Sequence, residues 1–111
     1  MNIKISEIKE LYKETMTIKR GIVKNSFEIK LKDKTIIRHY NSEVLTIEGD
    51  NMMLYNADYS VTTKKLVNSY LPANVCLHQQ AFEHFISVDG KEYEYKDYMV
   101  INISSLDITY N

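Results

Sequence analysis

The sequence predicts an α+β fold: a largely antiparallel sheet of about six or seven strands, with two amphipathic helices packed on one face of it. Two segments have the apolar spacing of helices, and several others alternate apolar with polar residues, as strands with one wet face do. Short turn motifs between these strands favour antiparallel hairpins. Because 111 residues is the size of one domain, we expect a single domain over residues 1–111.

The first predicted helix begins near the N-terminus. Ser6 is placed to act as its N-cap, and the acids Glu7 and Glu10 follow, where the helix dipole stabilises negative charge. The apolar residues at helical spacing form one stripe, Ile5, Ile8, Leu11 and Tyr12. The pattern then fades, and residues 18–23 are either a short strand or a connection.

Four strands are predicted next, as an antiparallel meander. Residues 27–32 alternate cleanly between apolar and charged side chains, and residues 35–40 form the second strand. Gly49-Asp50-Asn51 joins the third and fourth strands, at residues 44–47 and 52–55, because these residue types tolerate the positive φ of a tight reversal.

The second predicted helix follows a loop at residues 56–58. With Thr62 as its N-cap, Val61 and Leu66 occupy the two positions of a hydrophobic staple. One face of this helix is apolar and carries Leu66, Val67, Tyr70 and Leu71. Pro72 ends the helix.

The pattern is weaker beyond Pro72. Residues 73–80 are either a loop or a short strand. Asp89-Gly90 is the strongest turn signal in the chain and suits a type I′ hairpin. Strands are predicted on both sides of this turn and towards the C-terminus, at residues 82–88, 91–95, 98–103 and 106–110.

Composition limits the possible classes of protein. The single Cys76 cannot form an internal disulfide, and its apolar neighbours Val75 and Leu77 predict a small buried side chain in a reducing, cytoplasmic setting. No apolar run approaches a membrane span, and no secretory signal is evident. Residues 1–40 hold ten Lys/Arg against five Asp/Glu, whereas residues 41–111 hold four against ten. This asymmetry indicates either two charged surfaces or charges that folding interleaves.

Two short motifs carry a resemblance. Residues 40–44 read YNSEV and residues 58–64 read DYSVTTK. A YN-[ST]-x-V strand opening followed by a YSVTT-K helix start resembles a family of small uncharacterised bacteriophage proteins, over about residues 36–71. The resemblance implies a phage or prophage setting, and it implies no activity, cofactor or functional residue.

The residues that carry chemistry do not form a catalytic motif. His39, His78 and His84 lie at no spacing typical of a zinc site. Cys76 and His78 would share a strand face and could form a nucleophile and base, but no third orienting group is near in sequence. The chain has no glycine-rich phosphate loop, no GxSxG elbow and no HExxH. We therefore expect no enzyme activity and no cofactor or metal.

Nine tyrosines are an excess, and tyrosine is enriched in protein interfaces. In residues 91–98, alternation places Tyr93 and Tyr95 on one strand face and acids on the other. The hypothesis is an acidic hairpin that docks on a basic groove, with partner-binding residues Glu92, Glu94, Asp97 and Tyr98. The alternative interpretation is that the tyrosines are core and the acids a solvated face.

Two further functions stay open. A nucleic-acid-binding accessory protein would use basic strands through Lys30, Lys32, Lys34 and Arg38, although the sequence pI near 6.3 is untypical of DNA binders. A self-assembling component would pair through uncovered sheet edges, for example as a homodimer. The preferred expectation is a small non-enzymatic phage-type protein that binds a host protein, as an anti-CRISPR-like inhibitor of a defence effector.

Overall fold

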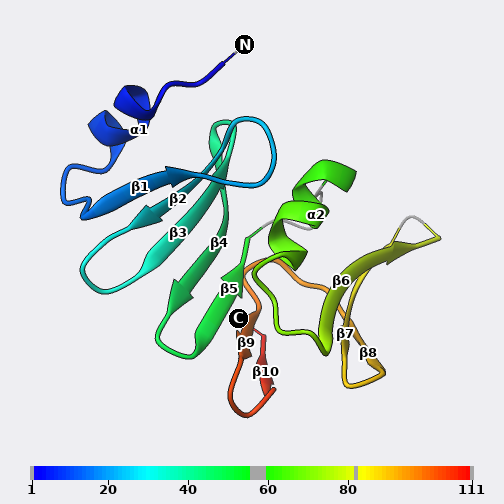
Figure 1. Ribbon diagram of the computed structural model, residues 1–111. Coiled ribbons are helices and arrows are strands. Elements are labelled where there is room, and N and C mark those ends of the chain that lie inside the picture. Colours follow the sequence, from blue (N-terminus) through cyan, green and yellow to red (C-terminus); the bar gives the residue numbers. More distant parts are fainter. Residues whose placement is uncertain (1, 56–59, 82, 111) are drawn as a thin grey trace.

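The computed structural model describes residues 2–55, 60–81 and 83–110 (Figure 1). The loop predicted at residues 56–58, Tyr59 of the YSVTT-K motif and Phe82 of a predicted strand therefore lie outside the described residues. Within the described residues the elements are α1 Ile5–Leu11, β1 Thr17–Arg20, β2 Ser26–Lys30, β3 Thr35–His39, β4 Ser42–Glu48, β5 Asn51–Leu54, α2 Val61–Asn68, β6 Val75–Gln80, β7 Glu83–Val88, β8 Lys91–Glu94, β9 Val100–Asn102 and β10 Ile108–Thr109.

These strands form two antiparallel sheets, which confirms the α+β class. Seven strands lie in the order β1-β2-β3-β4-β5-β9-β10, and β6-β7-β8 form a separate sheet of three. The chain leaves the large sheet after β5 and returns to it at β9, directly beside β5, where the Leu54 amide donates to the Met99 carbonyl at 3.0 Å. Helix α2 and the three-stranded sheet are therefore one insertion between two neighbouring strands.

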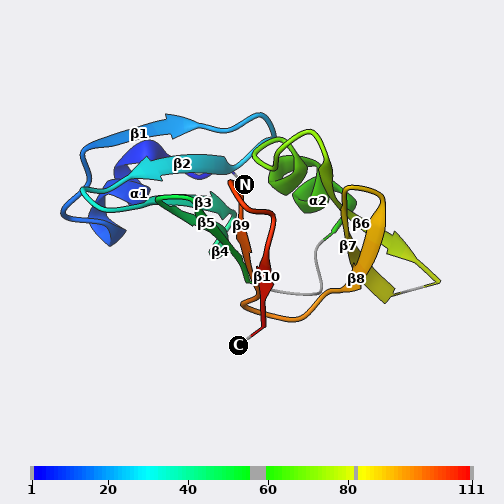
Figure 2. The same ribbon diagram turned by 90° about the horizontal axis from the view of Figure 1, so that it is seen from below.

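The two helices lie on opposite faces of the large sheet, so the prediction of one shared face is wrong. Ile36 and Ile37 are adjacent on β3 and point to opposite faces. Ile36 packs with Ile8 of α1, whereas Ile37 packs with Leu66 of α2. In both ribbon views α1 lies beside β1 to β3, at the far end of the molecule from the three-stranded sheet (Figures 1 and 2). Each face of the large sheet thus packs against one helix over part of its area.

Covering both faces also buries a residue that alternation places in water. Glu28 of β2 is buried on the α2 face, where Lys19 pairs with it at 3.3 Å and Tyr70 hydrogen-bonds to it. Burial and the Glu28 carboxylate together raise the pKa of Tyr70 to about 12. This contact fixes the end of α2 against β2.

A single core joins α2 to both sheets. It contains residues from the large sheet, the helix and the inner face of the small sheet, including Leu45, Leu54, Val67, Leu77, Ile86, Val88, Tyr95 and Ile101. Asn68 of α2 also binds the backbone of β6 at Leu77: its Nδ2 donates to the carbonyl at 2.9 Å, and its Oδ1 accepts from the amide at 2.7 Å. The helix therefore closes this edge of the small sheet.

Both helices begin earlier than predicted. Ser60 is the N-cap of α2, because its Oγ accepts a hydrogen bond from the Thr63 amide at 3.1 Å. Val61 is then the first helical residue and is 78% exposed, so the expected staple does not form. Helix α1 begins at Ile5, one residue before the expected cap, and the Lys4 amide donates to Glu7 Oε2 at 3.0 Å.

The C-terminal half contains the predicted strands with shorter bounds. Of the two possibilities for residues 73–80, a loop or a short strand, the structure has a strand, β6. In the segment 18–23, residues 18–20 belong to strand β1. Asp89 and Gly90 have φ values of +49° and +82°, as a type I′ turn requires. Leu106 has a φ of +65°, so the final strand begins only at Ile108.

Candidate functional site

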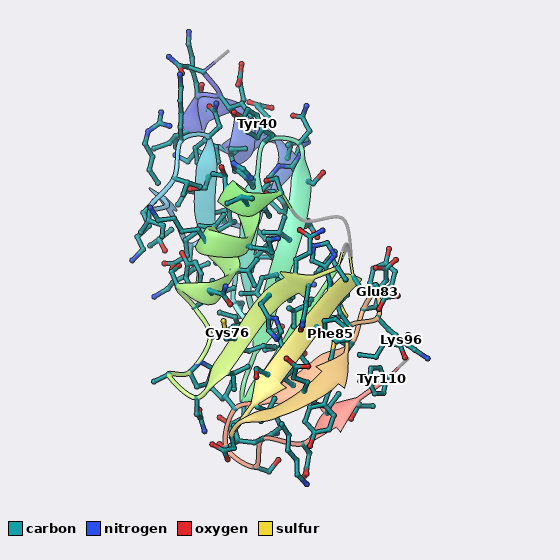
Figure 3. The ribbon with its side chains drawn as sticks, turned by 90° about the vertical axis from the view of Figure 1, so that its right-hand side faces the viewer. Tyr40, Cys76, Glu83, Phe85, Lys96 and Tyr110 are labelled. Atoms are coloured by element: carbon teal, nitrogen blue, oxygen red, sulfur yellow. The ribbon has the colours of Figure 1, made fainter. Side chains whose placement is uncertain are left out.

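The outer face of the three-stranded sheet is the first candidate site. Residues that lie directly opposite each other on paired strands share a face. Three cross-strand rows therefore form this outer face, Cys76–Ser87–Glu92, His78–Phe85–Glu94 and Gln80–Glu83. Figure 3 shows the face towards the viewer, with Cys76, Glu83 and Phe85 labelled. The opposite face is the core described above.

The outer face is acidic and carries two aromatic rings. His78 Nε2 lies 3.4 Å from Glu92 Oε1, and the His78 ring stacks on the Phe85 ring with centroids 5.9 Å apart. Glu83 and Glu94 are exposed beside this group. Lys91 is the only Lys or Arg of the three strands. It lies opposite Val88, in a row that belongs to the inner face of the sheet. The described residues of this face therefore present three glutamates, and no Lys or Arg, around a partly buried aromatic pair.

The four predicted partner-binding residues come from two parts of the chain, strand β8 and the connection that follows it. Glu92 and Glu94 lie on the outer face, while Tyr93 is half-buried and Tyr95 buried on the other side, as alternation predicts. Asp97 and Tyr98 lie in the connection from β8 to β9. The centroids of the Tyr98 and Tyr55 rings are 5.8 Å apart. Tyr98 stays 53% exposed.

Cys76 is exposed, so the prediction of a buried thiol is wrong. The structure places His78 on the same face, as expected, and adds Glu92 as the orienting carboxylate that sequence spacing does not supply. The central strand β7 pairs on both sides, so its amides are engaged in sheet hydrogen bonds and cannot form an oxyanion hole.

The three histidines do not share a site: His39 lies under α2, and His78 and His84, on the paired strands β6 and β7, point to opposite faces of the small sheet. His39 is buried under α2, with Nδ1 2.8 Å from Thr63 Oγ1, and burial lowers its pKa. His84 lies on the inner face of the small sheet, with its ring 6.3 Å from the Tyr95 ring. Among the described residues, no three His, Cys, Asp or Glu side chains are grouped so as to hold a metal ion.

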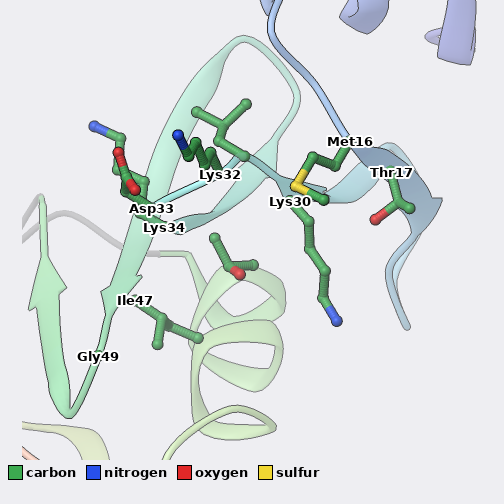
Figure 4. Close-up of a pocket in the computed structure, with 10 residues that line it drawn as sticks. Met16, Thr17, Lys30, Lys32, Asp33, Lys34, Ile47 and Gly49 are labelled. Atoms are coloured by element: carbon green, nitrogen blue, oxygen red, sulfur yellow. The ribbon is translucent and has the colours of Figure 1, made fainter.

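The four predicted nucleic-acid residues lie on two sides of the large sheet. Lys30, Lys32 and Lys34 line a pocket of about 380 Å³ at the β2–β3 hairpin (Figure 4). Arg38 faces α1 instead, where its Nη1 donates to the Tyr12 hydroxyl at 3.0 Å and its guanidinium lies over the Tyr12 ring. The four cations therefore do not follow one continuous track.

Tyr12, Arg38 and Glu43 form a hydrogen-bonded group on the α1 face, with Tyr12 at its centre. The Tyr12 hydroxyl donates to Glu43 and accepts from Arg38. Burial, reinforced by the Glu43 carboxylate, raises the pKa of Tyr12 to about 12. Because Tyr12 caps the C-terminal end of α1, this group fixes the helix to the sheet and has a structural role.

Comparison with protein-family models, curated proteins and solved structures finds no match to the chain. None of the described helices is long and apolar enough to cross a bilayer.

Proposed function

We propose that this chain is a non-enzymatic binding protein that docks the outer face of its three-stranded sheet on a basic surface of another protein. The observation that carries the proposal is the acidic face itself, with Glu83, Glu92 and Glu94 grouped around the His78–Phe85 ring pair. Opposite charge speeds such docking, and partly buried aromatic rings supply contact area at an interface centre.

The edges of the small sheet do not suit pairing with a second copy of this chain. If β8 paired antiparallel with β8 of another copy in a continuous sheet, residues of the same face would lie opposite each other. Glu92 or Glu94 would then face Glu92 or Glu94 of the copy, and like charges directly opposite are destabilising. The other edge of the small sheet is occupied at Leu77 by Asn68.

The phage setting and the role as an inhibitor of a host defence effector are part of the same proposal. The phage setting is what the YN-[ST]-x-V and YSVTT-K resemblance implies, and that resemblance itself carries no activity. The acidic face adds a physical reason, because an effector that binds nucleic acid has a basic groove on which such a face can dock.

The test is a comparative affinity capture from bacterial lysate, with and without nuclease treatment. The wild-type chain should retain one protein in stoichiometric amount, and the double variant Glu92→Lys/Glu94→Lys should lose it. With the purified partner, the double variant should associate about tenfold more slowly at low salt, and the difference should shrink as salt is added.

The matched control is Glu10→Lys/Glu14→Lys, which reverses two exposed acids in and just after α1. This variant should keep the wild-type association rate. Recovery that disappears with nuclease would favour nucleic acid as the partner instead. Equal binding by both double variants would show that the acids of β8 are only solvated surface.

A further inference from the structure

The pocket at the β2–β3 hairpin lies on the α2 face of the large sheet, beyond the part that α2 covers. Its floor is one cross-strand row through β1 to β4, formed by Thr17, Lys30, Thr35 and Ile47. Met16 and the hairpin residues 31–34 complete the lining, together with Gly49 (Figure 4). The next row along the sheet is the one in which Glu28 meets Tyr70 of α2.

The lining combines positive charge, hydroxyl groups and exposed apolar surface. The lining contains three lysines, Lys30, Lys32 and Lys34, and one acid, Asp33, which gives it a net charge of +2. The Lys30 side chain extends away from the hairpin residues (Figure 4). Within the described part of the chain, no salt bridge engages any of these lysines. Thr17 and Thr35 add hydroxyl groups on the floor, and Met16 is 70% exposed at the rim.

We propose that this pocket binds a small organic phosphate, a phosphate monoester attached to an apolar or aromatic body. A phosphate monoester carries a charge of about −1.5 to −2 at neutral pH, which matches the net charge of the lining. Lysine ammonium groups bind phosphate as point charges, and threonine hydroxyls donate to its oxygens. The body of the ligand packs on Met16 and Ile47, since methionine adapts to irregular partners.

The size of the pocket favours a small molecule over a nucleic-acid strand. A volume of about 380 Å³ lies within the range of small-ligand sites, which is roughly 300–1,000 Å³. A strand would need cations along a track, whereas Arg38 lies on the opposite face of the sheet with Tyr12. The site is separate from the acidic face of the small sheet and does not depend on its function.

The experiment is a titration of the ¹⁵N-labelled chain, followed by amide chemical shifts, with adenosine monophosphate as the probe. Adenosine tests the body without the phosphate, and inorganic phosphate tests the anion without the body. We expect amide shifts at Thr17, Thr35 and Ile47, and binding of the monophosphate about tenfold tighter than of either fragment. An oligonucleotide without terminal phosphates should bind more weakly than the monophosphate.

Variants separate the two halves of the site. Lys30→Gln/Lys34→Gln should weaken monophosphate binding about tenfold or more through loss of charge-assisted contacts, and Lys65→Gln, exposed on α2, should not. Thr17→Phe, on the edge strand, should fill the pocket and weaken binding while all lysines remain. Amide spectra of the variants report whether the fold is kept, and Lys34→Gln alone replaces the double variant if it is not.

Three results would overturn the proposal. The first is monophosphate binding that leaves the Thr17 and Thr35 amides unshifted. The second is equal binding by Lys30→Gln/Lys34→Gln and Lys65→Gln. The third is an oligonucleotide without terminal phosphates that binds tighter than the monophosphate through the same amides.

Discussion

Replacing Asn68 by alanine should detach α2 from β6 and destabilise the domain. The Asn68 side chain makes two hydrogen bonds to Leu77, a donor bond of 2.9 Å and an acceptor bond of 2.7 Å. Each neutral hydrogen bond contributes about 1 kcal/mol net, and Leu77 is buried, so Asn68→Ala should cost about 2 kcal/mol. For a domain of this size that is a fall of about 8 °C in Tm.

Asn68→Asp is a sharper test because it removes only one of the two bonds. A carboxylate still accepts from the Leu77 amide, but its second oxygen would face the Leu77 carbonyl oxygen, now without a donor. Protonation restores the donor, so the folded state should raise the pKa of this new carboxyl. The variant should therefore be most stable below about pH 4 relative to wild type and lose stability as pH rises through the raised pKa.

The measurements are urea unfolding and amide hydrogen exchange at Leu77. Asn68→Ala should speed exchange of the Leu77 amide, and Asn51→Ala, which breaks an exposed Asn51–Asn102 bond of 3.2 Å, should cost less than about 0.5 kcal/mol. The reasoning is refuted if Asn68→Ala costs no more than Asn51→Ala and the Leu77 amide exchanges at its wild-type rate.

Three further predictions concern single side chains. Burial lowers the pKa of His39, so the unfolded chain binds a proton at this residue more readily than the folded chain does. The free energy of unfolding should therefore fall as pH drops below about 6.5. His39→Gln should make this pH dependence weaker, as measured by urea unfolding at several pH values. Tyr12 and Tyr70, each with a pKa raised to about 12, should ionise last in an ultraviolet titration, and stability should be lost as pH rises from about 10 to about 12. Cys76 is exposed, so one thiol per chain should react with Ellman's reagent without denaturant.

Local sequence patterns predict the helices and strands of this fold better than they predict which face of the sheet each helix covers. Alternation and turn chemistry locate the meander, the Asp89-Gly90 hairpin and both helices, because these signals depend on near neighbours in sequence. The same alternation places Glu28 in water, and it cannot anticipate that Tyr70 of a later helix covers this carboxylate. The Ile36-Ile37 pair does signal burial of both sheet faces, since neighbouring strand residues point to opposite sides.

The candidate site is predictable in part for the same reason. Alternation in β8 places Glu92 and Glu94 together, whereas the addition of His78 and Phe85 to that face depends on the pairing of β6 with β7. The exposure of Cys76 has a sequence signal, because Val75 and Leu77 flank it in a strand and both point away from it. The lysine-lined pocket depends on where α2 stops covering the sheet, which local pattern does not contain.

The insertion of α2 and the small sheet between β5 and β9 has a consequence for the order of folding. The four pairings among β1 to β5 all join sequence neighbours, so these contacts form by closing short loops. The Met52–Ile101 pair must instead wait until the intervening chain has brought β9 back to β5. In pulse-labelling hydrogen exchange, we expect amides of β3 to gain protection before that of Ile101. Strands β1 to β5 would then form first, and β9 and β10 would add to the edge of this existing sheet at β5.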